Sequence, residues 1–176
     1  MIRRLIRAID RLNIAIGQGV SFLIWIGIAV LCFEVVARYV FDAPTIWAHG
    51  YTQRIFGSYF ILIGAYTLVQ RDHVRVDILL TPEPSRRNSA LDLINYAFLI
   101  LWGAVLTIEG WRFFLDAWKW AEVDDSALRH AMWPPKLALF IGSLLITLQG
   151  VNEAVKSILY LISPKDAEQE AARHDT

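Results

Sequence analysis

The sequence predicts an all-α integral membrane protein with four transmembrane helices. Hydrophobic residues make up 56% of the 176 residues and charged residues only 19%, a balance too apolar for an ordinary soluble domain of this size. The mean hydropathy is +0.41. The chain also contains 7 tryptophans, and indole rings favour the interface between bilayer and water.

Each predicted span is a long apolar run. The first, residues 20–41, would reach across the roughly 30 Å hydrocarbon core at about 1.5 Å per helical residue. The second covers residues 46–69 and the third residues 91–111. Proline suits the first turn of a helix, where the N–H has no partner within the helix, so Pro134 marks the approach to the fourth span, residues 136–162.

Two flanking segments differ from the spans, and a polar tail follows at residues 163–176. Residues 1–19 place apolar side chains at helical spacing and arginines on the opposite face. This pattern fits either a helix lying on an anionic leaflet or an extension of the first span. Residues 111–133 alternate aromatic and charged side chains too densely for hydrocarbon, so this segment is predicted to lie at the interface. The chain is interpreted as a single membrane domain, without a second domain or an internal repeat.

The positive charges predict the orientation. With four spans, the N-terminal segment, the second connection and the C-terminal segment lie on one side. Lys and Arg are more frequent there than in the other two connections, and cytoplasmic segments carry such an excess. Both termini are therefore predicted to be cytoplasmic.

Glu34 and Arg38 are charged residues inside an apolar run, at i and i+4 with the acid first, the favourable order for a helical ion pair. A charge at membrane depth normally faces protein or water, so a structural pair is the favoured interpretation, and Arg54 could equally reach Glu34. The alternative is a proton-coupling carboxylate, as in a small exporter. A neighbouring arginine favours the ionised carboxylate, which does not suit a group that must take up and release protons.

The sequence contains no recognisable catalytic or cofactor site. Its four histidines fall in connections or the tail, so a bis-histidine haem lacks ligands. The single Cys32 allows neither an intrachain disulfide nor a CxxC site, and no P-loop, GxSxG or HExxH motif occurs. The formal net charge of zero gives no field that would attract nucleic acid. We therefore expect no enzyme, no cofactor and no nucleic-acid partner.

Four sequence elements follow one another in order: EVVARYVF-D-APTIW at the end of the first span, LIGA within the second, HVRVD after it, and WPPKLALFIGSLLITLQG in the fourth. Together, over about residues 14–161, they resemble the small membrane subunit of TRAP transporters, the tripartite ATP-independent periplasmic carriers. The expected structural or partner-contact residues are Glu34, Arg38, Tyr39, Asp42, Pro44, Trp47, Arg54, Gly64, His73, Arg75, Asp77, Trp133 and Pro134.

The resemblance implies a multi-pass protein of the bacterial inner membrane that works with two partners besides the lipid bilayer. A periplasmic solute-binding protein would capture an organic acid, and a large multi-span membrane subunit would carry the substrate and sodium sites. The small subunit would brace the scaffold of the large one. In this scheme Glu34, Arg38 and Arg54 lock the outer end of the first helix, so that residues 42–47 present a defined turn. His73 to Asp77 would organise the second connection against the large subunit.

The chain departs from the family pattern at two places. Ala48-His49-Gly50 stand where many members have acidic residues, and Asp72 stands where many have glycine. Two other interpretations stay open: a self-contained exporter that uses Glu34 for coupling, and a membrane assembly or anchoring protein. The solute cannot be read from this chain, and a carboxylate such as a 2-oxo acid is the family-level expectation.

Overall fold

The computed structural model describes residues 2–70 and 86–162, which form helices throughout most of their length. This result confirms the all-α fold class. Three of the helices, α1, α3 and α4, are long and apolar enough to cross a membrane. The helices are α1 Ile2–Tyr39, α2 Ala48–Val69, α3 Arg86–Lys119 and α4 Trp133–Ile162.

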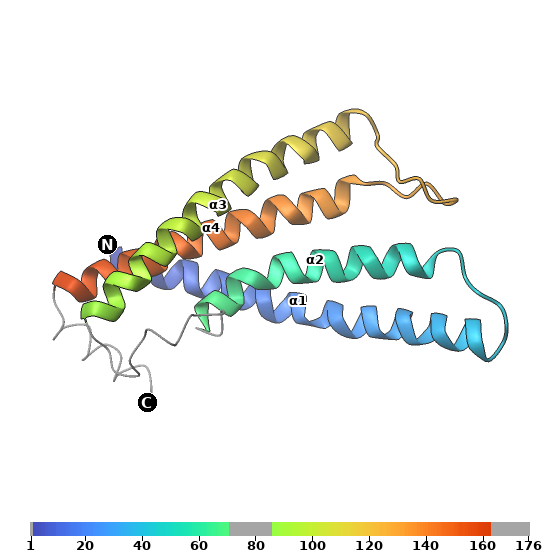
Figure 1. Ribbon diagram of the computed structural model, residues 1–176, viewed down its shortest axis with the longest axis horizontal. Coiled ribbons are helices and arrows are strands. Elements are labelled where there is room, and N and C mark those ends of the chain that lie inside the picture. Colours follow the sequence, from blue (N-terminus) through green and yellow to red (C-terminus); the bar gives the residue numbers. More distant parts are fainter. Residues whose placement is uncertain (1, 71–85, 163–176) are drawn as a thin grey trace.

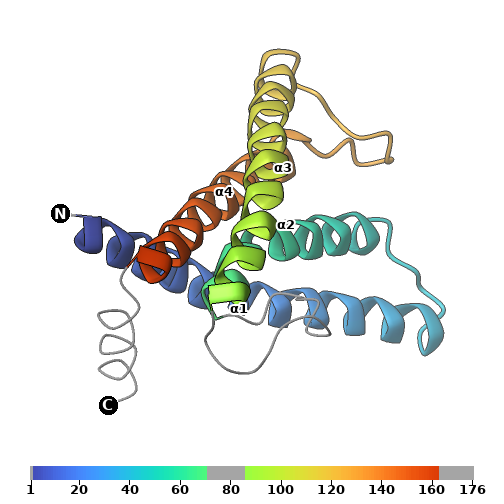
Figure 2. The same ribbon diagram turned by 60° about the vertical axis from the view of Figure 1, so that its left-hand side comes forward.

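The helices form two antiparallel hairpins, α1–α2 and α3–α4 (Figure 1). The hairpins cross at an angle, as Figure 2 shows. Helix α4 packs on both α3 and α2 and also touches α1, whereas no contact joins α1 to α3 among the described residues. The beginning of α1 and the end of α4 lie at the same end of the bundle (Figure 1), as an even number of membrane crossings requires.

Helix α1 is continuous over 38 residues, which corresponds to about 57 Å. It is therefore much longer than the roughly 30 Å hydrocarbon core, and residues 2–19 are a helical extension of the predicted first span. The helix ends at Tyr39. Asp42 then has a φ of 50°, a left-handed conformation that aspartate tolerates better than most residues, and the Ala43 N–H donates back to the Ala37 carbonyl at 3.0 Å.

Helix α2 begins at Ala48, two residues later than predicted, and contains 22 residues, or about 33 Å. Its length would cross a bilayer, but its first two turns contain the polar residues His49, Gln53 and Arg54. It is not among the three helices that qualify by length and composition. The second membrane span therefore stays a prediction.

Helix α3 extends well beyond the predicted limits of 91–111 and ends at Lys119. The reason is a row of aromatic side chains at helical spacing. The ring centroids of Trp111 and Phe114 lie 5.6 Å apart, and those of Phe114 and Trp118 lie 6.1 Å apart. The helix therefore continues eight residues past the predicted end of the third span, and the interfacial position of residues 111–133 stays a prediction. The connection comprises residues 120–132, and an isolated β-bridge joins Val123 to Ala131 within it.

Glycines allow α2 and α4 to approach closely. A Cβ at Gly142 would lie 2.7 Å from the backbone carbonyl oxygen of Ile61, and one at Gly64 would lie 2.7 Å from the Cδ1 atom of Ile146. Small residues at such crossings let the backbones of membrane helices come together. Gly64 is thus a helix-packing residue of the bundle, on the side where the two hairpins meet.

Candidate functional site

The first group of polar contacts surrounds Glu34 near the end of α1. Its side chain is 10% exposed. One carboxylate oxygen accepts hydrogen bonds from Arg38, at 3.1 Å from Nε. The other accepts from the Thr45 backbone N–H at 3.1 Å and from the Thr45 hydroxyl. The ion pair expected from the i, i+4 spacing is present, and the same carboxylate also holds the turn that follows the helix.

Thr45 connects this carboxylate to the start of α2, because its hydroxyl also accepts from the Ala48 N–H at 3.4 Å. This residue was not predicted from the sequence. The N-cap of α2 is Trp47, whose side chain makes no capping hydrogen bond, and Thr45 supplies the contact from two residues earlier. Threonine hydroxyls often accept from nearby backbone N–H groups in turns, and that was the available signal. The turn between α1 and α2 is therefore fixed from both sides.

Arg54 does not join Glu34, contrary to the expectation. Its guanidinium donates to the Gly50 carbonyl at 2.9 Å and forms an ion pair with Asp124 in the α3–α4 connection. Arg54 lies on the side of α2 that faces this connection, and Arg38 and Thr45 already occupy both oxygens of Glu34. The residues predicted to act together, Glu34, Arg38 and Arg54, thus belong to two separate groups rather than one.

Asp124 organises the connection between α3 and α4. Its Oδ1 accepts from the Ser126 hydroxyl at 2.7 Å and from the His130 N–H at 2.8 Å. Hydrogen bonds hold the pKa of the Asp124 carboxyl well below its usual range, and the bond from Arg54 has the largest effect, followed by the bond from Ser126. This group was not predicted from the sequence, although Asp and Ser are residue types that favour turns.

A row of aromatic rings runs beside these contacts from α1 to the α3–α4 connection. Phe33 stacks on Trp47 with centroids 5.8 Å apart, Trp47 meets Tyr51 edge-on at 6.0 Å, and Tyr51 meets His130 at 4.9 Å. Several of the expected contact residues are exposed around this row: Tyr39, Asp42, Pro44 and Trp47. They form an open outer turn rather than part of the core.

The two expected contact residues at the start of α4 occupy the other side of this end of the bundle. Trp133 begins α4 and meets Trp118 of α3 edge-on, with centroids 5.4 Å apart. Pro134 is the second residue of the helix and is exposed. Both residues thus belong to the junction where the α3–α4 connection enters α4.

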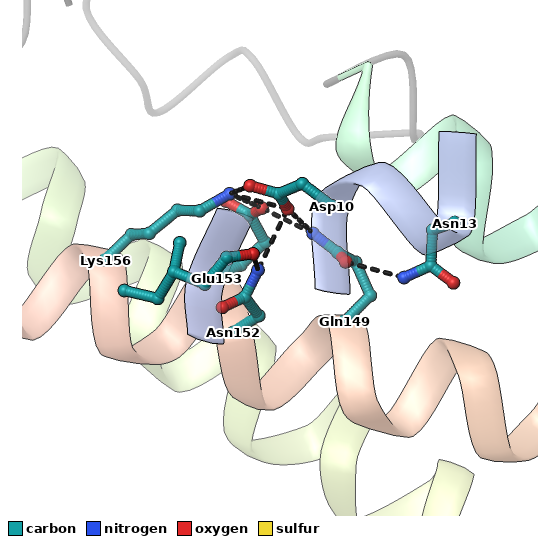
Figure 3. A network of polar contacts seen from close by, with 7 residues as sticks. Asp10, Asn13, Gln149, Asn152, Glu153 and Lys156 are labelled. Atoms are coloured by element: carbon teal, nitrogen blue, oxygen red, sulfur yellow. Dashed lines mark hydrogen bonds and ion pairs between the residues drawn. The ribbon is translucent and has the colours of Figure 1, made fainter. Parts of the chain in front are cut away.

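A second polar group lies where α1 meets α4, at the opposite end of the bundle (Figure 3). We call it the Asp10 cluster; it comprises Asp10, Asn13, Gln149, Asn152, Glu153 and Lys156. The Oδ1 atom of Asp10 accepts from Gln149 at 2.8 Å, Asn152 at 2.9 Å and Lys156 at 3.0 Å. One carboxylate of α1 therefore holds three side chains of α4.

The rest of the cluster is well buried. Gln149, which is 0% exposed, accepts from the side chain of Asn13 at 2.7 Å and donates to Glu153 at 2.8 Å. Glu153 also accepts from Lys156 at 2.6 Å. Glu153 and Lys156 are three residues apart on α4, a spacing that favours a helical ion pair. The α1 partners were missed, since nothing in the spacing of α1 indicates which helix its polar side chains would meet.

The predicted cytoplasmic group of His73, Arg75 and Asp77 lies outside the described residues. Within residues 2–70 and 86–162, no group of three or more His, Cys, Asp or Glu side chains could hold a metal ion. The contacts described above hold helices and turns in place. The Ser126 hydroxyl, which lies 3.3 Å from His130 Nδ1, also donates to Asp124 in the α3–α4 connection.

Comparison with known proteins gives the family. The family model for the DctQ component of tripartite ATP-independent periplasmic transporters matches residues 27–159. A curated relative from Vibrio cholerae serotype O1, a C4-dicarboxylate TRAP transporter small permease protein, is 30% identical over 96 residues. That match covers 52% of this chain and 41% of the relative. The apolar helices agree with the multi-pass membrane protein that this match indicates, and the chain belongs to the DctQ family of small TRAP transporter subunits.

Proposed function

We propose that this chain braces the scaffold of a large TRAP membrane subunit and helps to form the surface on which a periplasmic solute-binding protein docks. The family match over residues 27–159 is the observation that carries the proposal. The distribution of polar groups supports it. Buried polar side chains bond within the chain, while large apolar side chains on α1 and α3 face outward, which suits a subunit surrounded by lipid and by another membrane protein.

The complex would take up an organic acid together with sodium across the bacterial inner membrane, with both termini of this chain in the cytoplasm. The name of the related Vibrio protein specifies a C4-dicarboxylate, so succinate-like acids are the first solutes to test and 2-oxo acids the second. In this orientation the turn at residues 42–47 and the connection at residues 120–132 would face the periplasm.

The test is solute uptake into proteoliposomes that hold the assembled complex. We expect Glu34→Gln to lower uptake, because the neutral amide loses the ion pair with Arg38 and holds the Thr45 turn less tightly. Lys119→Gln, an exposed change on α3, is the matched control. If Glu34→Gln and Arg38→Gln both assemble and transport like the unchanged complex, the outer turn has no part in the function.

The contacts of Glu34 speak against the self-contained exporter. Both of its oxygens accept hydrogen bonds from Arg38 or Thr45, whereas a coupling carboxylate must exchange these partners for a proton or solute. The exporter predicts transport by this chain alone, and our proposal predicts none without the large subunit. For the cytoplasmic side, we propose that His73, Arg75 and Asp77 contact that subunit. An unchanged yield of complex after all three become alanine would contradict this role.

A further inference from the structure

An open groove runs along the C-terminal half of α3 where it faces the beginning of α4. Its volume is about 360 Å³, and it is lined by Thr107, Ile108, Trp111 and Arg112 of α3 and by Phe140 of α4. None of these residues belongs to the Glu34 group, the Arg54–Asp124 pair or the Asp10 cluster. They belong to the packing of α3 on α4, where Trp111 meets Phe140 and the Thr107 and Thr147 hydroxyls lie 3.4 Å apart.

The floor of this groove is apolar. The Trp111 ring packs against Phe140 with centroids 5.0 Å apart, and the Thr107 hydroxyl donates to the Gly103 carbonyl of its own helix at 2.7 Å. With that hydroxyl occupied, the surface offered by the floor consists of the isoleucine, the aromatic rings and the threonine methyl group. Such a surface fits a hydrocarbon chain.

Arg112, which lines the groove, is paired with Glu109, which lies beside the lining residues on α3. Arg112 donates through Nη1 to Glu109 at 2.8 Å, and their side chains are 67% and 43% exposed. A guanidinium has five N–H donors, so four remain for another acceptor. The pair presents an arginine and a carboxylate together, next to Trp111, a residue type that favours the headgroup level of a bilayer.

We propose that this groove binds a phospholipid with an ethanolamine headgroup from the surrounding membrane. An acyl chain would lie along Ile108 and Phe140, the phosphate would accept hydrogen bonds from Arg112, and the ammonium would donate to Glu109. The headgroup is chosen by charge complementarity. An anionic headgroup without an amine leaves Glu109 facing negative charge, and a choline headgroup has no N–H to donate.

This inference goes beyond the proposed function, because it requires only that α3 crosses a bilayer. The test reconstitutes the full chain in phosphatidylcholine vesicles that contain increasing fractions of a lipid with brominated acyl chains, either phosphatidylethanolamine, phosphatidylcholine or phosphatidylglycerol. Bromine quenches nearby indole fluorescence. The contribution of Trp111 is the difference between the chain and its Trp111→Phe variant. Far-UV circular dichroism checks that every variant keeps its helices.

We expect half-maximal quenching of Trp111 at a fraction of the ethanolamine lipid roughly two- to fivefold lower than for the other two lipids, as contacts between exposed charges allow. Glu109→Gln with Arg112→Gln should abolish this preference, while Lys119→Gln should preserve it. Equal quenching by all three lipids overturns the proposal. A preference that survives in the double variant overturns it as well. An equal preference for phosphatidylglycerol also does so, because that lipid has no ammonium to donate to Glu109. The proposal is also overturned if none of the three lipids quenches the fluorescence of Trp111.

Discussion

Replacing Asp10 by alanine should loosen the attachment of α1 to α4. Asp10 accepts hydrogen bonds from three side chains of α4. Hydrogen bonds between membrane helices contribute about 0.6 kcal/mol on average and at most about 1.7 kcal/mol. The side chains of Asp10 and Lys156 are 21% and 31% exposed, so the average value applies to each of the three hydrogen bonds. Asp10→Ala should therefore lower the free energy of unfolding by about 2 kcal/mol.

The direction of the charge effect provides a sharper test. After Asp10→Ala, Lys156 still has Glu153 as its partner, and no buried charge is left alone. After Lys156→Met, Asp10 and the buried Glu153 both lose the cation that they share, so this variant should lose more stability than Asp10→Ala. The double variant should lose less than the two single losses combined, because both remove the same ion pair.

The free energy of unfolding can be measured in mixed detergent micelles by tryptophan fluorescence. Asp116→Ala is the matched control, since Asp116 is an exposed residue of α3 and its side chain makes no contact among the described residues. The reasoning is refuted if Asp10→Ala and Asp116→Ala have the same effect within about 0.5 kcal/mol. It is also refuted if Lys156→Met is the milder of the two cluster changes.

Two further predictions concern helix packing and the outer connection. Gly142→Ala should destabilise the protein, because a clash with the α2 backbone costs about 1–3 kcal/mol against about 1 kcal/mol gained in helix propensity. Gly64→Ala should cost less stability, since only the end of the Ile146 side chain must move, and Gly57→Ala should be neutral or stabilising because the space around it is open. Thermal unfolding ranks the three variants. The reverse order of stability would contradict the described packing. Asp124→Asn should lower the unfolding temperature by a constant amount from pH 8 to about pH 5. The native pKa is depressed below the ordinary 3.8, so this advantage is present above that value and is lost as pH falls below it. The comparison is repeated with His130→Gln added to both the unchanged protein and the Asp124→Asn variant. A difference in unfolding temperature that already disappears at pH 6 would contradict the prediction.

Contacts within one helix could be predicted from the sequence, but contacts between helices could not. The pairs Glu34–Arg38 and Glu109–Arg112 follow from spacings of four and three residues, which place side chains on the same helical face. Arg54 and Asp124 are 70 positions apart. Their contact depends on how the hairpins cross and on a fold of the connection, neither of which appears in a spacing.

The helix boundaries show the same distinction. The beginning of α4 could be anticipated because prolines mark it locally. The end of α3 could not, because charged residues after Trp111 suggested the end of hydrocarbon, whereas the helix follows the packing of Trp111, Phe114 and Trp118 beyond that level. Composition predicts where a membrane would end, and aromatic packing determines where this helix ends.

The two hairpins are fastened at both ends of their crossing. Arg54 and Asp124 connect them at one end, and Asp10 with the α4 side chains connects them at the other. A single fastening would act as a pivot, about which one hairpin could swing relative to the other. Two such contacts separated along the bundle, with the close α2–α4 packing at Gly64 and Gly142, fix the crossing angle. Loss of either polar contact should leave the hairpins freer to rotate about the contacts that remain.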